Sequence, residues 1–199
     1  MKIAMIGKGN VGKALAKSLS GKHEIRFGHR DPNESVEAAV KWGEVIILAM
    51  PYGAVANCAL AFGSDVDGKI VVDCTNPLDE KCELTIGFTT SAAEEIQKKL
   101  PKARVVKAFN TVAAKHQSSG KIGQEQISLF VASDFDDAKK LAMQLGREIG
   151  FDLVDAGPLM ASRYLEPMAK FIIGLESSSG KGSEFAYKML KAIPMKESS

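Results

Sequence analysis

The sequence predicts an α/β protein with a Rossmann-type, doubly wound and mainly parallel sheet, followed by short C-terminal helices. First, short apolar runs alternate with helical patterns along most of the 199 residues, which favours parallel strands joined by crossover helices. Second, a glycine-rich turn joins the first strand to the first helix. Third, the pattern is helical again from Met160. No internal repeat or low-complexity linker interrupts it, so we expect one domain, residues 1–199, with residues 160–193 as a helical appendage.

The first strand and the first helix enclose the glycine-rich turn. An apolar run at residues 3–6 leads into it, and apolar residues then recur at helical spacing as far as Leu19. The three glycines have the spacing G-x-G-x-x-G: Gly7, Gly9 and Gly12. Between a strand and a helix this spacing is typical of a dinucleotide site. The alternative is a glycine turn that binds nothing.

Each glycine has an expected role in such a site. The first permits the tight turn, the second lets backbone N–H groups approach a pyrophosphate, and the third lets helix and strand pack closely. The N-terminus of the following helix adds unpaired N–H groups and partial positive charge that favour an anion.

The end of the second strand, expected at residues 23–28, indicates which dinucleotide binds. An NAD site commonly has an acidic residue about 20 positions beyond the glycines, which binds the ribose hydroxyls. Arg30 stands in this region, and a guanidinium can pair with the 2′-phosphate of NADP. The sequence therefore favours NADP, although Asp31 follows at once. Arg30 as a solvated surface charge is the plainer alternative, and His29 is either a loop residue or a neighbour of the adenine or phosphate.

The next elements alternate again. We expect a short helix over 33–42, a strand over 44–50, a small helix over 54–62 and a strand over 68–75. Pro51 stops the first of these strands and presents Tyr52 at the carboxyl edge of the sheet, where open α/β folds bind ligands. The side chain of Tyr52 either packs in the protein or contacts the cofactor, and the sequence favours neither role. The loop at 76–78 lies at the same edge.

The second half of the chain continues the alternation. Residues 79–88 are irregular and either cover a ligand crevice or form a surface loop. Ser91 begins a capping box, which predicts a helix to Leu100. The other expected elements are strands over 103–109, 126–132 and 151–156, and a loop over 113–126, either irregular throughout or with one helical turn. A helix that Asp134 caps runs to Ile149, and Gly150 closes it.

The last part of the chain is expected to be helical. One helix runs from Met160 to about Leu175, and three charged residues on it can form ion pairs with one another: Arg163, Glu166 and Lys170. A turn over 177–183, a short helix over 184–193 and a frayed tail complete the expected structure.

Composition argues against several classes of protein. The net charge of +2 without a long basic run argues against a nucleic-acid surface. No apolar run approaches the roughly 18 residues of a membrane helix, and the first residues enter a strand at once, which leaves no room for a signal peptide. Three cysteines and three histidines lack metal-ligand spacing. We therefore expect a cytoplasmic protein with reduced thiols, no metal site and no nucleic-acid or membrane partner.

Three fragments resemble one group of reductases. They are IGKGNVGKALA near the start, VVKAFNTVAA at 105–114 and DAGPLMASRYLEPMA at 155–169. Together they resemble the NADP reductases that depend on coenzyme F420, a deazaflavin, and the N-terminal domains of STEAP metalloreductases. The glycine motif is shared by many Rossmann proteins, whereas the third fragment is much more specific. The resemblance spans nearly the whole chain.

The resemblance implies a set of binding residues and a homodimer with contacts between C-terminal helices. The pyrophosphate would be held by Gly7, Gly9, Asn10, Val11 and Gly12, and the 2′-phosphate by His29 and Arg30. Residues near the nicotinamide would be Met50, Pro51 and Asn110. The acceptor pocket would be formed by Asn110, Gly157, Pro158 and Leu159.

The resemblance also implies the reaction, a hydride transfer between NADPH and a flavin-like acceptor, coenzyme F420 or a flavin. Deazaflavin-using relatives carry a histidine where this chain has Asn110, whereas the metalloreductase domains carry Phe-Asn, so the acceptor stays open. Asn110 either donates a hydrogen bond to one of the rings or caps the turn after its strand.

Hydride transfer asks little of protein acids and bases, and the sequence offers no nucleophile–base pair, so the catalytic residues are not identified. A non-catalytic NADP-binding redox-sensing module is the alternative function. A hydroxy-acid or imine dehydrogenase is disfavoured because such enzymes need a long helical second domain, and only 40 residues follow Leu159.

Overall fold

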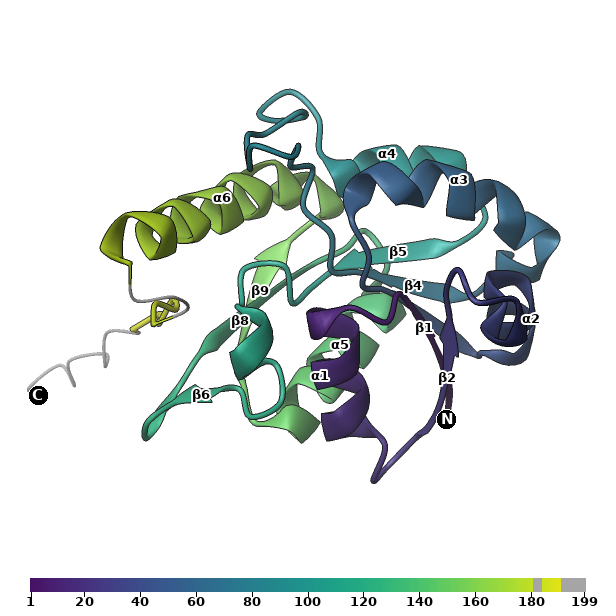
Figure 1. The fold of residues 1–199 in the computed structure, drawn as a ribbon, viewed down its shortest axis with the longest axis horizontal. Coiled ribbons are helices and arrows are strands. Elements are labelled where there is room, and N and C mark those ends of the chain that lie inside the picture. The colour runs from purple at the N-terminus through teal and green to yellow at the C-terminus, as the bar shows by residue number, and fades with distance from the viewer. Residues whose placement is uncertain (181–183, 191–199) are drawn as a thin grey trace, which may run out of the picture.

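Seven strands form one sheet with helices on both faces in this computed structural model, which describes residues 1–180 and 184–190 (Figure 1). The strands are β1 (Lys2–Ile6), β2 (Glu24–Gly28), β3 (Val45–Leu48), β4 (Ile70–Asp73), β5 (Arg104–Lys107), β8 (Ser128–Ala132) and β9 (Asp152–Gly157). Their order in the sheet is β2-β1-β3-β4-β5-β8-β9, and only β5 and β8 pair antiparallel. The predicted α/β fold with a mainly parallel sheet is confirmed.

Two layers of helices cover the sheet, because its strands carry apolar side chains on both faces. The helices are α1 (Asn10–Leu19), α2 (Val36–Trp42), α3 (Tyr52–Phe62), α4 (Ala92–Lys99), α5 (Asp136–Ile149) and α6 (Ser162–Ser179). One core lies under α1 and α5, and the other lies under α2, α3 and α4 (Figure 1). A third, smaller cluster packs Leu165 of α6 against Phe130 of β8.

The sheet order places a crevice beside the glycine turn. After β1 the chain adds β2 on one side of it and then returns to add β3 on the other side of β1. The direction in which strands are added to the sheet therefore reverses between β1 and β3. Ligands of open parallel sheets bind outside the carboxyl ends of the strands at such a switch point. Gly7 follows β1 there, and Met50 follows β3. The glycine turn is therefore at the position where this kind of sheet binds ligands.

Two helices begin differently from the expectation. The region 33–42 divides into a 3-10 turn, η1 (Pro32–Glu34), and α2, because the hydroxyl of Ser35 accepts the N–H of Ala38 and starts a new helix. Asp134 does not cap α5, which begins after Phe135. Its carboxylate instead accepts the N–H of Leu159 at 3.0 Å, a partner 25 residues away. The prediction of an Asp134 cap is wrong because a tertiary contact replaces the local one.

The region 113–126 contains a helical turn, which the sequence allowed, and a hairpin, which it did not predict. It contains a 3-10 turn, η3 (Ala114–His116), and a small hairpin of β6 (Lys121–Ile122) and β7 (Glu125–Gln126). The carbonyl oxygens of Phe109 and Val112 accept hydrogen bonds from the buried amide of Gln117, which holds this segment against the end of β5.

The C-terminal region also departs from the expectation. Helix α6 continues through 177–179, where a turn was expected. Residues 184–190 are not helical, because their main chain pairs with β8: Ser128 N–H donates to Tyr187 O, and Met189 N–H donates to the Ser128 hydroxyl. The predicted helix over 184–193 is therefore wrong over 184–190. Residues 181–183 and 191–199, including the predicted tail, lie outside the described residues.

Candidate functional site

The three glycines differ in the space around them. A Cβ at Gly7 would lie 2.3 Å from the Ala49 carbonyl oxygen, and one at Gly12 would lie 2.2 Å from the Gly7 carbonyl oxygen. Gly7 also has a φ of +111°, which favours glycine. A Cβ at Gly9 would meet nothing within 4 Å. Gly7 and Gly12 thus allow strand and helix to approach each other, whereas Gly9 faces open space at the N-terminus of α1.

A cleft of about 460 Å³, here called the glycine cleft, opens beside this turn. Six residues that the sequence singled out line it: Gly7, Gly9, His29, Arg30, Met50 and Pro51. They come from the ends of β1, β2 and β3, which adjoin one another in the sheet. The cleft therefore lies at the switch point, where this kind of sheet binds ligands.

Charged side chains surround one end of the glycine cleft. Both carboxylate oxygens of Glu34 accept hydrogen bonds from Lys8 Nζ, at 2.6 and 2.8 Å, and the carboxylate also contacts His29 Nε2. These hydrogen bonds, that of Lys8 first, hold the pKa of Glu34 below its usual range. The carboxylate of Asp31 accepts a hydrogen bond from the N–H of Asn33 at 3.0 Å. Lys8 and Glu34 were missed in the sequence, although Lys8 stands inside the glycine motif.

Arg30 is exposed at this end of the cleft and makes no hydrogen bond or ion pair within residues 1–180 and 184–190. Its guanidinium is therefore available to an anion. Because Lys8 and His29 already contact Glu34, Arg30 is the cation at the rim of the cleft that a phosphate would meet.

Asn110 belongs to a second cavity at the ends of β4 and β5. Its Nδ2 donates to Asn76 Oδ1 at 3.0 Å and to the Leu165 carbonyl oxygen at 2.9 Å, while Asn76 Nδ2 donates to the Asn110 carbonyl oxygen. Both N–H groups of the Asn110 amide are thus used within the protein. Its Oδ1 is buried and has no hydrogen-bond partner in the described part of the chain. Phe109, the preceding residue, adopts a φ of +66°, an uncommon conformation often found at functional sites.

This second cavity, here called the asparagine pocket, has a volume of about 250 Å³. Val11 lines it beside the glycine turn, and Asn76 and Asn110 line it at the sheet edge. Helix α6 contributes apolar side chains that include Ala169 and Ile172. The pocket is therefore mainly apolar, with a polar acceptor atom on one of its lining residues.

The segment 157–159 lies elsewhere. The residues that line the asparagine pocket do not include Gly157, Pro158 or Leu159. Leu159 is 2% exposed and packs in the core under α2, α3 and α4. Helix α6, which begins just after this segment, forms part of the wall of the asparagine pocket.

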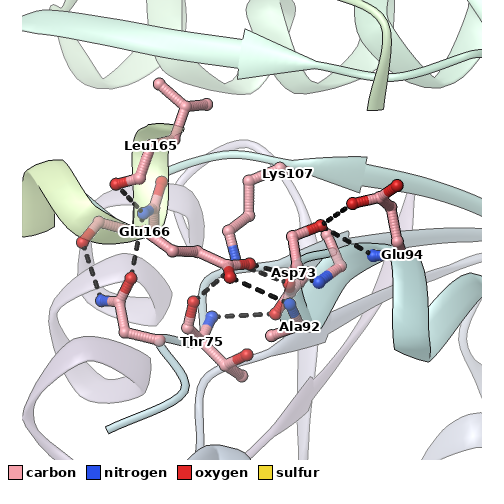
Figure 2. A network of polar contacts seen from close by, with 11 residues as sticks. Asp73, Thr75, Ala92, Glu94, Lys107, Leu165 and Glu166 are labelled. Atoms are coloured by element: carbon pink, nitrogen blue, oxygen red, sulfur yellow. Dashed lines mark hydrogen bonds and ion pairs between the residues drawn. The ribbon is translucent and has the colours of Figure 1, made fainter. Parts of the chain in front are cut away.

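A buried ionic network fixes α6 over the sheet (Figure 2). Lys107 Nζ lies 2.8 Å from Asp73 Oδ2 and 2.7 Å from Glu166 Oε1, and it donates to the Thr75 carbonyl oxygen at 2.7 Å. All three charged side chains are 0% exposed. Asp73 and Lys107 are paired neighbours in β4 and β5, whereas Glu166 comes from α6. The network therefore joins two strands to the helix that walls the asparagine pocket.

Glu166 also meets the N-terminus of α4. Its carboxylate accepts the N–H groups of Ala92 at 2.9 Å and Ala93 at 3.2 Å, where the helix dipole favours negative charge. Burial raises the pKa of Glu166, and the Lys107 ammonium partly offsets this effect. Burial also disfavours the charged form of Lys107, but the carboxylates of Asp73 and Glu166 outweigh it and raise the pKa of this lysine.

The ion pairs expected within α6 do not form. Arg163 binds both carboxylate oxygens of Glu94 in α4, at 2.9 and 2.7 Å, and Lys170 pairs with Glu83 at 2.7 Å. The segment 79–88 that carries Glu83 thus contacts α6. Sequence reasoning missed the Lys107 network, although a lysine and an aspartate inside apolar strands are an unusual signal that could have revealed it.

Comparison with known proteins relates the chain to a group of reductases. No family model matches it. It is 29% identical to the F420-dependent NADP reductase of Methanocaldococcus jannaschii over 217 aligned positions, which cover 92% of this chain and 96% of the relative. A crystal structure from Arthrobacter sp. FB24, described provisionally as an F420-dependent NADP reductase, superposes with a TM-score of 0.90 at 27% identity and covers 96% of this chain and 100% of that one.

The chain is homologous to F420-dependent NADP reductases. It is also 29% identical to the metalloreductase STEAP3 of Rattus norvegicus over 83% of its own length, which spans 36% of STEAP3. The resemblance drawn from the three sequence fragments is thus confirmed. The F420-dependent NADP reductase homologues match this chain over nearly their full length, so the glycine turn, the Phe109–Asn110 turn and α6 all lie within the shared region. Among the described residues, no helix is both long and apolar enough to cross a membrane.

Proposed function

We propose that this protein is an NADPH-dependent oxidoreductase that transfers a hydride between NADPH and a flavin-like acceptor, coenzyme F420 or a flavin. The observation that carries this proposal is that two cavities flank the glycine turn: the glycine cleft, which Gly9 and Arg30 line, and the asparagine pocket, which Val11 and Asn110 line. The homologues that match nearly the whole chain are named as reductases of this kind.

The residues present fit NADP at its phosphate end. The space above Gly9 leaves room for a pyrophosphate at the N-terminus of α1, where Asn10 and Val11 carry N–H groups without a helical partner. The free guanidinium of Arg30 suits the 2′-phosphate. Met50 and Pro51 line the glycine cleft and not the asparagine pocket, so we assign them an apolar contact with the adenosine in place of the contact with the nicotinamide that the resemblance implies.

The residues at the asparagine pocket fit the nicotinamide end. The buried Oδ1 of Asn110 needs a donor, and the amide N–H of a nicotinamide would supply one. Asn110 therefore acts as an acceptor towards this group, because both of its N–H groups are already bound to Asn76 and Leu165. When NADPH is bound it supplies the hydride, and the acceptor ring takes it up.

The protein's own contribution is orientation and the exclusion of water. Asn110 fixes one edge of the ring, and the apolar side chains of α6 cover the pocket. The Lys107–Glu166 pair holds α6 in this place. Hydride transfer between the two rings needs no side chain to exchange a proton with them.

The choice between the two acceptors rests on different observations. The names of the relatives favour coenzyme F420. The asparagine at position 110, shared with the metalloreductases and not with the deazaflavin-using relatives, favours a flavin. The resemblance also assigns Gly157, Pro158 and Leu159 to the acceptor, but none of them lines the asparagine pocket, so our proposal for the acceptor does not rest on them.

We also propose a homodimer. Two large apolar side chains are exposed on α6, Tyr164 at 64% and Phe171 at 61%, and Met160, in the 3-10 turn η4 (Leu159–Ala161) just before the helix, is 49% exposed. Residues 164 and 171 share one side of α6, so with Met160 they form a stripe that a second copy of α6 would cover.

The test is turnover with two cofactors and two acceptors. Purified protein is mixed with NADPH or NADH and with coenzyme F420 or FMN, and the loss of NADPH absorbance is followed. Steady turnover with NADPH and at least one acceptor is expected, with NADH much poorer. Tight binding of NADPH without turnover of either acceptor would favour the redox-sensing module, and no binding of NADPH would contradict both.

A further inference from the structure

A third cavity, with a volume of about 480 Å³, lies between α1 and η3. We call it the lysine groove, because Lys13 and Lys17 line it from α1 and Lys115 lines it from η3. Helix α1 packs against η3, the short teal turn beside it in Figure 1, so the groove is formed by two elements distant in the sequence. Asn10 and Ser118 complete its polar lining.

The three lysines of the groove are exposed and unpaired. None of them makes an ion pair or a hydrogen bond through its ammonium group in the part of the chain that the structure describes. Other surface lysines do find carboxylates, as Lys102 does with Asp67 and Lys188 with Asp152. Lys13 and Lys17 are also one helical turn apart, a like-charge spacing that slightly destabilises a helix. The groove thus concentrates positive charge that the fold does not use.

The phosphates of NADP do not account for this charge. They are placed at Gly9 and Arg30 in the glycine cleft, and the lining of that cleft includes none of the three groove lysines. The ligand of the lysine groove is therefore a different anion.

The lysine groove continues into the asparagine pocket. Ala114 lines both cavities, and Asn10 of the groove is followed directly by Val11 of the pocket. A molecule with a ring in the pocket would extend into the groove at this point. The pocket is mainly apolar and suits a ring, whereas the groove is basic and suits phosphate or carboxylate groups.

We propose that the lysine groove binds the anionic tail of the electron acceptor, so that the natural acceptor is a redox ring with a phosphorylated or carboxylated chain. This proposal rests on the proposed function, because it assigns the second substrate of the same reaction. The lysines act as point charges that hold the tail, while the acceptor ring stacks on the nicotinamide at the asparagine pocket. Because they are exposed, salt weakens their attraction for the tail.

The test compares two flavins that differ only in the tail. FMN carries a phosphate and riboflavin does not. Each is titrated against the NADP⁺-loaded protein at low salt, and the dissociation constant is measured by quenching of flavin fluorescence. We expect FMN to bind about tenfold more tightly than riboflavin, from three exposed charge pairs, and the difference to shrink in high salt.

Two matched variants complete the test. K13A/K17A/K115A should abolish the preference for FMN. K41A/K99A/K140A removes the same charge from exposed lysines that line none of the three cavities, and it should retain the preference. Equal affinity for the two flavins, failure of both to bind, or a preference that survives in K13A/K17A/K115A would overturn the proposal.

The binding result is separable from the proposed function. If FMN binds through the lysines but no hydride reaches it from NADPH, the groove is an anion site and the oxidoreductase assignment fails for flavins. If NADPH reduces both flavins and the two bind with equal affinity, the oxidoreductase assignment holds and the groove proposal fails.

Discussion

Lys107 in β5 and Glu166 in α6 form a fully buried ion pair, 2.7 Å between Nζ and Oε1. Glu166 is preceded by Leu165, whose carbonyl oxygen accepts a hydrogen bond from Asn110. The same turn of α6 thus binds the buried lysine and the residue proposed to hold the nicotinamide. Loss of the ion pair is expected to disturb the asparagine pocket as well as the stability of the fold.

Glu166→Ala tests this connection. Removal of one partner leaves the Lys107 charge with Asp73 alone and frees two N–H groups of α4, so we expect a loss of about 3–5 kcal/mol in the free energy of unfolding. Urea denaturation gives the measurement. Lys102→Ala, which removes an exposed partner of Asp67, is the control and should leave stability unchanged. A Glu166→Ala protein as stable as the control would show that the network does not hold α6.

The Arg163–Glu94 pair predicts a loss of stability in acid. Hydrogen bonds from Arg163 hold the pKa of Glu94 below its unfolded value of 4.5. A group with a lowered folded pKa stabilises the protein above its unfolded pKa, and this contribution is lost as the pH falls through the folded pKa. Glu94→Gln should therefore lower stability at neutral pH and flatten its decline below pH 4.5. Unfolding curves over this range provide the check, and parallel declines for both proteins would contradict it.

Gly9 and Gly12 should respond differently to the same substitution. Gly12→Ala would place a Cβ 2.2 Å from the Gly7 carbonyl oxygen, and we expect a loss of about 3 kcal/mol in stability. Gly9→Ala has open space and a φ of −77°, so its cost is at most about 1 kcal/mol, that of alanine at an N-cap. Because the added methyl group occupies the expected pyrophosphate position, Gly9→Ala should still lose NADPH affinity. Thermal unfolding and NADPH titration on both variants separate the two effects. Unchanged NADPH binding by Gly9→Ala would place the pyrophosphate elsewhere.

Arg30 should distinguish the two dinucleotides. Arg30→Ala removes a charged hydrogen-bond donor, so NADPH binding is expected to weaken by about 1.5–3 kcal/mol while NADH binding changes little. Arg26→Ala is the control, because that guanidinium lies 4.6 Å from the Trp42 ring centre and lines neither the glycine cleft nor the asparagine pocket. Calorimetric titrations with both nucleotides give the answer. Equal losses for NADPH and NADH would mean that Arg30 does not contact the 2′-phosphate.

The exposed stripe on α6 predicts the oligomeric state. Light scattering after size exclusion should report a dimer for the unmodified chain. Phe171→Glu, which puts a charge at a side chain now 61% exposed, should convert it to a monomer without loss of secondary structure. A monomer before substitution, or an undisturbed dimer after it, would show that the stripe is not the interface.

Local signals account for most of the elements. Strands β1, β3, β4 and β5 are recognisable because their central residues are buried on both faces and are therefore apolar. The end of α5 was correctly expected at Gly150, whose φ of +115° suits glycine at that position. The start of α5 was not, because the carboxylate of Asp134 binds Leu159, which no local pattern reveals.

The sequence by itself determined the sheet, the glycine turn and the family resemblance, since each depends on short patterns that dictate backbone conformation or are matched directly in relatives. Only the tertiary structure decided that Glu166 pairs with Lys107 and not with the charged residues of α6, and that both N–H groups of Asn110 are already bound. It also decided that three lysines line one groove: Lys13, Lys17 and Lys115. These are pairings between distant segments, and the distances that create them arise only when the helices pack on the sheet.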